Sequence, residues 1–204
     1  VADQVEVFTH SWEPEAASLR WTSNGREGYS IETLDEPLDR GTRIVIHLKD
    51  EYEEFSQEYR VKELLRRYSN FVGFPINFNG EHINTVQAIW SKSKSDVKPE
   101  EYDEFYQFIS HTDEKPLSYM HFSADAPIML NALLFIPKRN PEMFGFGRVD
   151  ANVSLYCKRV LIDAKPEGLL PEWLRFLNGV VDSEDLPLNI SREMLQDNSL
   201  AVSY

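Results

Sequence analysis

The sequence has very little cysteine and no long apolar run. A single cysteine, Cys157, stands among the 204 residues, so an internal disulfide is impossible and a reducing compartment is the simple inference. No apolar stretch approaches the ~20 residues that cross a bilayer. No charged segment followed by an apolar one opens the chain, so we expect no secretory signal. These absences argue against a disulfide-stapled secreted domain and against a membrane-spanning helix.

Basic residues are also scarce. Lysine and arginine number 21 against 34 aspartates and glutamates, which gives a net charge of −13. Nucleic acids and anionic membranes need a basic surface, so neither is an expected partner. The five histidines are scattered without the spacing of metal ligands, and we expect no metal site. Hydrophobic residues make up 42% of the chain, which is enough for a substantial core.

The chain opens with a strand-rich part. Alternating apolar residues predict strands over 1–7, 19–22, 28–33 and 41–48, with Asn24-Gly25 as a hairpin turn. A sheet this small buries one face and needs helices that this part lacks. Because the strand pattern is already under way at Val1 and no initiator methionine is present, we expect a fragment of a longer protein. An acidic joint at 50–54 ends this part.

The remainder mixes helices and strands, which predicts an α/β layered domain of the α+β type. Helical spacing predicts helices over 55–68, 99–109 and 171–178. Pro99 suits the first position of the second helix, and Gly179 is expected at the C′ position of the third. Strands are predicted over 84–90, after a turn at Asn79-Gly80, and over 117–122, 128–136 and 153–162. We expect the domain boundaries 1–50 and 51–204.

Two features are candidates for protein binding. The loop 142–147 carries Met143, Phe144 and Phe146 between prolines and glycines. Since loops lie at the surface, some of these apolar side chains are expected to be exposed. Trp90 is the second candidate, and an ordinary core tryptophan is its alternative.

The most informative stretch is 179–196. It reads as a short apolar strand, an acidic turn and a helix with Ser191 as its N-cap. Arg192 then lies against the positive end of the helix dipole, which is unfavourable unless an anion binds there. Gln196 follows one turn later on the same face. Two interpretations stay open: a phosphate or carboxylate site, or a surface arginine paired with an acidic residue of the turn.

The stretch 179–196 closely resembles the segment by which the middle domain of heat-shock protein 90 chaperones reaches its nucleotide. The resemblance extends along nearly the whole chain and is closest to the bacterial and mitochondrial branch of that family. It implies that Arg192 contacts the γ-phosphate of ATP, that Gln196 assists, and that Asn189 lies in the same catalytic loop. It also implies that Trp90 and the 143–146 loop contact client proteins.

The first part resembles the last sheet strands of the family's N-terminal ATP-binding domain. The resemblance implies that Gly41 and Thr42 belong to the nucleotide site, with Thr42 lining the adenine pocket. An ordinary β-branched strand residue is the alternative for Thr42. The family's catalytic glutamate, magnesium-binding asparagine and lid lie upstream of the matching region. We therefore expect this fragment alone to bind no nucleotide and to be inactive, whereas the parent protein uses ATP with Mg²⁺.

The resemblance further implies an overall fold and a setting. The fold is an antiparallel strand meander over 1–50 and a three-layer αβα middle domain, like ribosomal protein S5, over 51–204. The parent is expected to be a homodimeric stress-response chaperone that folds client proteins, in the bacterial cytoplasm or the mitochondrial matrix. One alternative is a non-catalytic protein-binding module or scaffold. Another is an unrelated hydrolase that uses the carboxylates of Asp182, Glu184 and Asp185.

Overall fold

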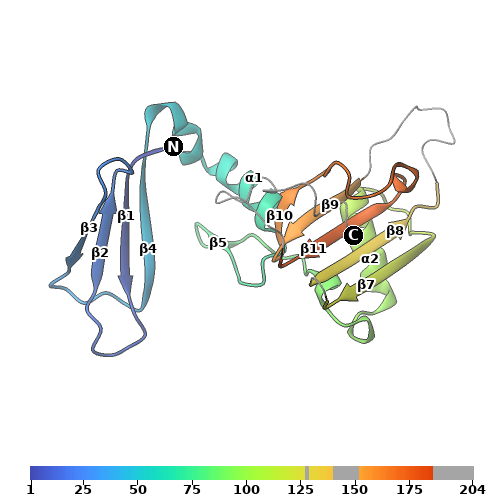
Figure 1. The fold of residues 1–204 in the computed structure, drawn as a ribbon, viewed down its shortest axis with the longest axis horizontal. Coiled ribbons are helices and arrows are strands. Elements are labelled where there is room, and N and C mark those ends of the chain that lie inside the picture. The colour runs from blue at the N-terminus through green and yellow to red at the C-terminus, as the bar shows by residue number, and fades with distance from the viewer. Residues whose placement is uncertain (127–128, 140–151, 186–204) are drawn as a thin grey trace. The chain divides into compact units, whose positions relative to one another are not determined.

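The computed structural model describes residues 1–126, 129–139 and 152–185. The chain divides into two compact units, Val1–Glu63 and Leu64–Tyr204, and the boundary falls within helix α1 (Glu58–Ser69). Each unit has a β-sheet of its own, and helices accompany the second sheet (Figure 1). The predicted mixed α+β class is therefore confirmed.

The first unit is a four-stranded antiparallel sheet in the order β3-β2-β1-β4. The predicted turn at Asn24-Gly25 joins two of these strands, and Gly25 takes a φ of +73° that favours glycine. The elements of this unit are β1 (Ala2–His10), β2 (Leu19–Ser23), β3 (Tyr29–Thr33), β4 (Gly41–Leu48) and the 3₁₀ segment η1 (Asp50–Ser56).

The second unit is built on a five-stranded sheet in the order β10-β9-β11-β8-β7. The β9–β11 pair is parallel and the other pairs are antiparallel. The elements are β5 (Asn77–Phe78), β6 (Glu81–His82), η2 (Ile89–Ser91), η3 (Lys94–Asp96), α2 (Pro99–Ser110), β7 (Ser118–Ala124), β8 (Leu130–Ile136), β9 (Asn152–Cys157), β10 (Val160–Asp163), η5 (Glu172–Leu174) and β11 (Asn178–Ser183).

Apolar clusters cover both faces of this sheet at its central strands, whereas most side chains of the edge strand β7 are exposed. Successive strand side chains point to opposite faces, so Leu133 and Phe135 of β8 join one apolar cluster, while Ala132 and Leu134 join another. Helix α2 and η2 belong to the first cluster, and residues 169–177 supply much of the second. Burial on both sides explains why β8 is almost uniformly apolar.

Helix α2 begins as predicted, with Pro99 at its start. The Glu101 carboxylate accepts the backbone N–H of Lys98 at 2.8 Å, so it caps the first turn. That backbone hydrogen bond and the Lys92 ammonium lower the pKa of Glu101. The predicted apolar face is buried, and its buried members are Tyr102, Phe105 and Tyr106.

The helix predicted over 171–178 is wrong. Only the single 3₁₀ turn η5 forms there, and the side chain of Trp173 within it is 73% exposed. Gly179 is not a helix C′ residue but lies within β11. A Cβ at this position would collide with the carbonyl oxygen of Leu133, so glycine allows β8 and β11 to approach closely.

Two strand predictions also need correction. Residues 84–90 do not form a return strand, because Asn84 holds a loop: its side chain accepts the N–H of Ile76 at 2.7 Å and donates to the carbonyls of Val72 and Phe74. The stretch 153–162 is two strands, β9 and β10, joined by a tight turn at residues 158–159.

Candidate functional site

The structure describes only three of the predicted site residues. Gly41 and Thr42 lie in the first unit and Trp90 lies in the second. The remaining predicted site residues lie outside the described part of the chain: Asn189, Arg192, Gln196, Met143, Phe144 and Phe146.

Thr42 lies at an exposed end of β4, paired with Thr9 of β1. The Thr9 hydroxyl oxygen is 3.3 Å from the carbonyl oxygen of Gly41 and 3.0 Å from the Thr42 hydroxyl oxygen. If Thr9 donates to the carbonyl, Thr42 donates to Thr9, and the lone pairs of the Thr42 oxygen remain as acceptors. A ligand with an N–H donor fits this arrangement.

An apolar sheet face extends from this threonine pair. Val7 of β1 lies opposite Ile44 of β4 and Trp21 of β2, and Trp21 lies opposite Ile31 of β3. Directly opposed residues share a face, so these side chains form one surface. Ile31, Ile44 and Ile46 are exposed on it. A face of this kind is typical of a sheet that packs against further structure.

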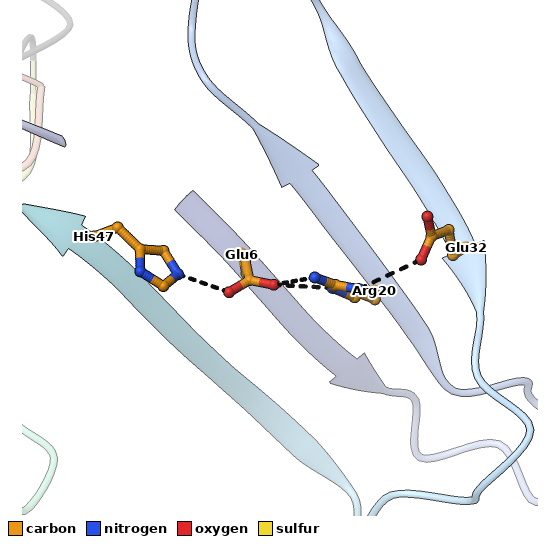
Figure 2. A network of polar contacts seen from close by, with 4 residues as sticks. All are labelled: Glu6, Arg20, Glu32 and His47. Carbon is orange, nitrogen blue, oxygen red and sulfur yellow. Dashed lines mark hydrogen bonds and ion pairs between the residues drawn. The ribbon is translucent and has the colours of Figure 1, made fainter. Parts of the chain in front are cut away.

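The opposite face of the same sheet carries a polar network (Figure 2). The Glu6 carboxylate pairs with Arg20 on β2 and lies 2.8 Å from Nε2 of His47 on β4, and Arg20 also reaches Glu32 on β3. The hydrogen bond with His47 and then that with Arg20 lower the pKa of Glu6. The network crosses all four strands and lies away from the threonine pair.

Trp90 is a core residue. Its side chain has no exposed surface and packs against the rings of Phe71, Phe105 and Tyr156. Its indole Nε1–H donates to Oδ2 of Asp182 at 2.9 Å. The alternative considered from the sequence, a core tryptophan, is what the structure contains, and a buried indole contacts no client in this state.

Asp182 is a buried carboxylate at the end of β11. It is 5% exposed, and Oδ2 also accepts the backbone N–H of Arg159 at 3.1 Å. Its other oxygen, Oδ1, is buried and has no hydrogen-bond partner within the described residues. Burial raises the pKa of Asp182, while the hydrogen bonds from Trp90 and Arg159 oppose that rise.

Two further side chains fix the chain just after Asp182. The Ser183 hydroxyl donates to the carbonyl of Met129 at 2.7 Å. The Asp185 carboxylate accepts the N–H of Met129 at 2.8 Å. The sequence that carries Asn189 and Arg192 therefore begins within a few residues of a firmly anchored strand end.

The raised pKa of Asp182 predicts how stability depends on pH. The folded chain holds this proton more tightly than the unfolded chain, so its contribution to stability is complete below the unfolded pKa of about 3.9. That contribution is lost as the pH rises through the folded pKa. Because Asp182→Asn cannot ionise, the wild type should lose stability relative to this variant as the pH rises above about 4.

Urea unfolding at several pH values between 4 and 7, followed by near-ultraviolet circular dichroism, measures this difference. Asp163→Asn, at an exposed position on β10, is the control. The same pH trend in both variants, or a trend of opposite sign for Asp182→Asn, would refute the assignment.

Sequence reasoning missed two buried polar contacts. One is the pair of Trp90 and Asp182, which lie 92 residues apart. The other is His121, which is buried with Nδ1 at 2.8 Å from the Tyr102 hydroxyl and Nε2 at 3.0 Å from the carbonyl of Trp90. Alternation in β7 could have marked His121 as inward-facing, but no local signal identifies its partners.

Within the described ranges, no cluster of histidine, cysteine, aspartate and glutamate could hold a metal ion. The helices described in those same ranges are too short or too polar to cross a membrane.

Comparison with known proteins gives consistent results. A family model described as "Hsp90 protein" matches residues 77–202. The chain is 55% identical over 201 residues to Chaperone protein HtpG of Desulfitobacterium hafniense (strain Y51), covering 98% of this chain and 32% of that protein. It is 42% identical over 201 residues to Heat shock protein 75 kDa, mitochondrial, of Rattus norvegicus, covering 98% of this chain and 28% of that protein. The chain therefore spans about a third of the length of these relatives.

Proposed function

Because the chain belongs to the Hsp90 protein family, we propose that it is part of an ATP-dependent chaperone. It would join the end of an ATP-binding domain to the larger part of a middle domain. The observation that carries this proposal is the anchored end of β11. Three side chains, those of Asp182, Ser183 and Asp185, hold this strand end within the stretch 179–196, a few residues before Asn189 and Arg192.

The first unit supports a role in nucleotide binding. The acceptor lone pairs of Thr42 suit the exocyclic amino group of adenine, and the adjoining apolar face suits its ring. We propose that Gly41 and Thr42 border the adenine site and that the rest of the apolar face packs against the remainder of an ATP-binding domain. ATP, with Mg²⁺, is the substrate in this proposal.

The proposed chemistry of the second unit rests on Arg192. A guanidinium can bind two phosphate oxygens at once and can neutralise the charge that develops on the γ-phosphoryl group. Gln196 and Asn189 would help to orient this group. The water-activating base would come from another part of the parent, so the 204-residue chain by itself should hydrolyse no ATP.

The hydrolase alternative loses support from the structure. Asp182 is buried and held by Trp90 and Arg159, and Asp185 accepts a backbone N–H from Met129. Two of its three candidate carboxylates therefore have structural partners. A catalytic pair would need both groups to face one accessible site.

We assign client binding to Met143, Phe144 and Phe146. These residues supply three large apolar side chains in a short glycine-containing stretch, a composition suited to contact with unfolded protein. The parent is proposed to act on such clients as a homodimer.

Replacing Phe144 and Phe146 by serine should weaken capture of a partly unfolded client while the melting temperature stays nearly unchanged. The reason is that an exposed apolar contact contributes to binding but little to folding. Light scattering of a thermally unfolding client measures capture, and Trp173→Ser is the control for loss of an exposed aromatic ring elsewhere. A collapse of the melting temperature in the double variant would show that these phenylalanines belong to the core.

The nucleotide part of the proposal is tested in a chimaera. In the chimaera, residues 1–204 of this chain replace the matching third of Chaperone protein HtpG from Desulfitobacterium hafniense. The 55% identity makes the junctions conservative, and the relative supplies the parts that this chain does not contain. ATP hydrolysis by the chimaera, compared with the relative itself, reports whether this chain performs the proposed role.

A further inference from the structure

A groove of about 460 Å³ lies on the second unit, apart from the residues discussed above as nucleotide or client contacts. Residues 71–75 and 82–92 form most of its walls, and Arg159 lies at its edge. Phe74, which is 79% exposed, gives the groove an open apolar wall together with Pro75 and Val86.

The groove is basic although the chain is acidic. Its lining includes the cationic side chains of Arg159 and Lys92, and no aspartate or glutamate. The whole chain, by contrast, has a net charge of −13. A local reversal of charge in a concave site favours an anionic ligand.

Arg159 is placed in this groove by an unusual turn. Lys158 and Arg159 join β9 to β10 with φ angles of +50° and +65°, a conformation for which asparagine and glycine are the usual residues. The backbone N–H of Arg159 is held by Asp182. Non-glycine residues in this region are strained and occur preferentially at functional sites.

The guanidinium of Arg159 lies across the loop that forms the groove wall. A Cβ on Gly73 would come within 2.7 Å of Nη1, so the missing side chain of Gly73 makes room for it. In the parts of the chain that the structure describes, no carboxylate lies within ion-pair distance of this guanidinium. The Asp182 carboxylate interacts with Arg159 electrostatically, but the hydrogen bond that it accepts comes from the backbone N–H of Arg159 and not from the guanidinium.

Lys92, unlike Arg159, has a carboxylate partner for its charged group. Its ammonium lies 2.6 Å from Oε1 of Gln87 and 3.2 Å from the Glu101 carboxylate. These contacts fix Lys92 at the groove and compensate part of its charge. Recognition of an anion therefore depends mainly on Arg159, whose planar group can hold both oxygens of a carboxylate.

We propose that this groove binds an acidic peptide segment in which a carboxylate lies next to an apolar side chain. The carboxylate would pair with Arg159 and the apolar side chain would lie against Phe74. The open apolar wall favours such a peptide over a small inorganic anion, which would leave Phe74 without a partner. This site depends on neither ATP nor the 143–146 residues.

The test uses the 204-residue chain and a synthetic hexapeptide. The peptide has blocked ends and alternates two aspartates with two phenylalanines between terminal glycines, and a twin carries asparagines in place of the aspartates. Arg159→Asn removes the guanidinium and suits the positive φ, so the turn should keep its fold. Lys158→Asn is the matched control, since it removes the same charge from the neighbouring turn residue, which does not line the groove.

Binding is followed by chemical-shift changes of the labelled chain during titration. We expect the acidic peptide to shift resonances of residues 71–75, its asparagine twin to bind roughly tenfold more weakly, and Arg159→Asn to weaken binding by a similar factor. Lys158→Asn should bind as the wild type does. Absence of binding at millimolar peptide, equal binding of the twin, or equal loss in both variants would overturn the proposal.

Discussion

Arg192→Ala in the chimaera should lower the rate of ATP hydrolysis by about a thousandfold or more, the range seen when an arginine that stabilises a transferring phosphoryl group is removed. ADP affinity should stay nearly unchanged, because ADP has no γ-phosphate for this side chain to contact. Steady-state hydrolysis and calorimetric titration with ADP measure the two quantities separately.

Arg192→Lys distinguishes charge from geometry. A lysine keeps the positive charge but cannot reproduce the planar two-pronged contact of a guanidinium, so we expect poor rescue of hydrolysis. Equal losses of ADP and ATP affinity in Arg192→Ala would assign this residue to general phosphate binding or to folding. Full activity in Arg192→Lys would show that only its charge matters.

Trp90→Ala should lower the free energy of unfolding of the second unit by about 4 kcal/mol. Truncating a large buried aromatic side chain costs about 3–5 kcal/mol. The change also removes the only side-chain donor that the described residues give to the buried Asp182 carboxylate. A typical domain is stable by about 5–15 kcal/mol, so the variant should lose a large fraction of its stability.

Trp173→Ala is the matched control for that experiment, since it removes the same side chain from an exposed position. Its effect on the free energy of unfolding should be within about 0.5 kcal/mol. Urea denaturation of the two variants gives the comparison. Equal destabilisation by both changes, or a loss in Trp90→Ala as small as that of the control, would contradict the packing described for Trp90.

Local signals in the sequence predicted the elements that depend on local chemistry. The turns at Asn24-Gly25 and Asn79-Gly80 follow from residues that tolerate a positive φ, and the start of α2 follows from Pro99. The strand 128–136 was recognisable from its apolar run, although the structure begins β8 at Leu130. These features depend on a few neighbouring residues.

Elements fixed by distant contacts were not predictable in the same way. Gly179 resembles a helix end in sequence, and only its close approach to Leu133 explains why it is a strand residue. The turn at Lys158-Arg159 carries neither glycine nor asparagine, so the sequence predicts a single strand over 153–162 where the structure has two. The contact between Trp90 and Asp182 spans 92 residues and has no local signature. For Thr42, the sequence allowed a pocket residue or an ordinary strand residue, and its pairing with Thr9 required the structure.

The most direct measurement is the steady-state rate of ATP hydrolysis by the chimaera that contains residues 1–204. We predict a rate within about a factor of ten of the rate of the unmodified relative, since the segments proposed to reach the nucleotide would be supplied by this chain. Circular dichroism and a cooperative melting transition would establish that the chimaera is folded. A folded chimaera that binds ATP but hydrolyses it only at background rate would contradict the proposed function.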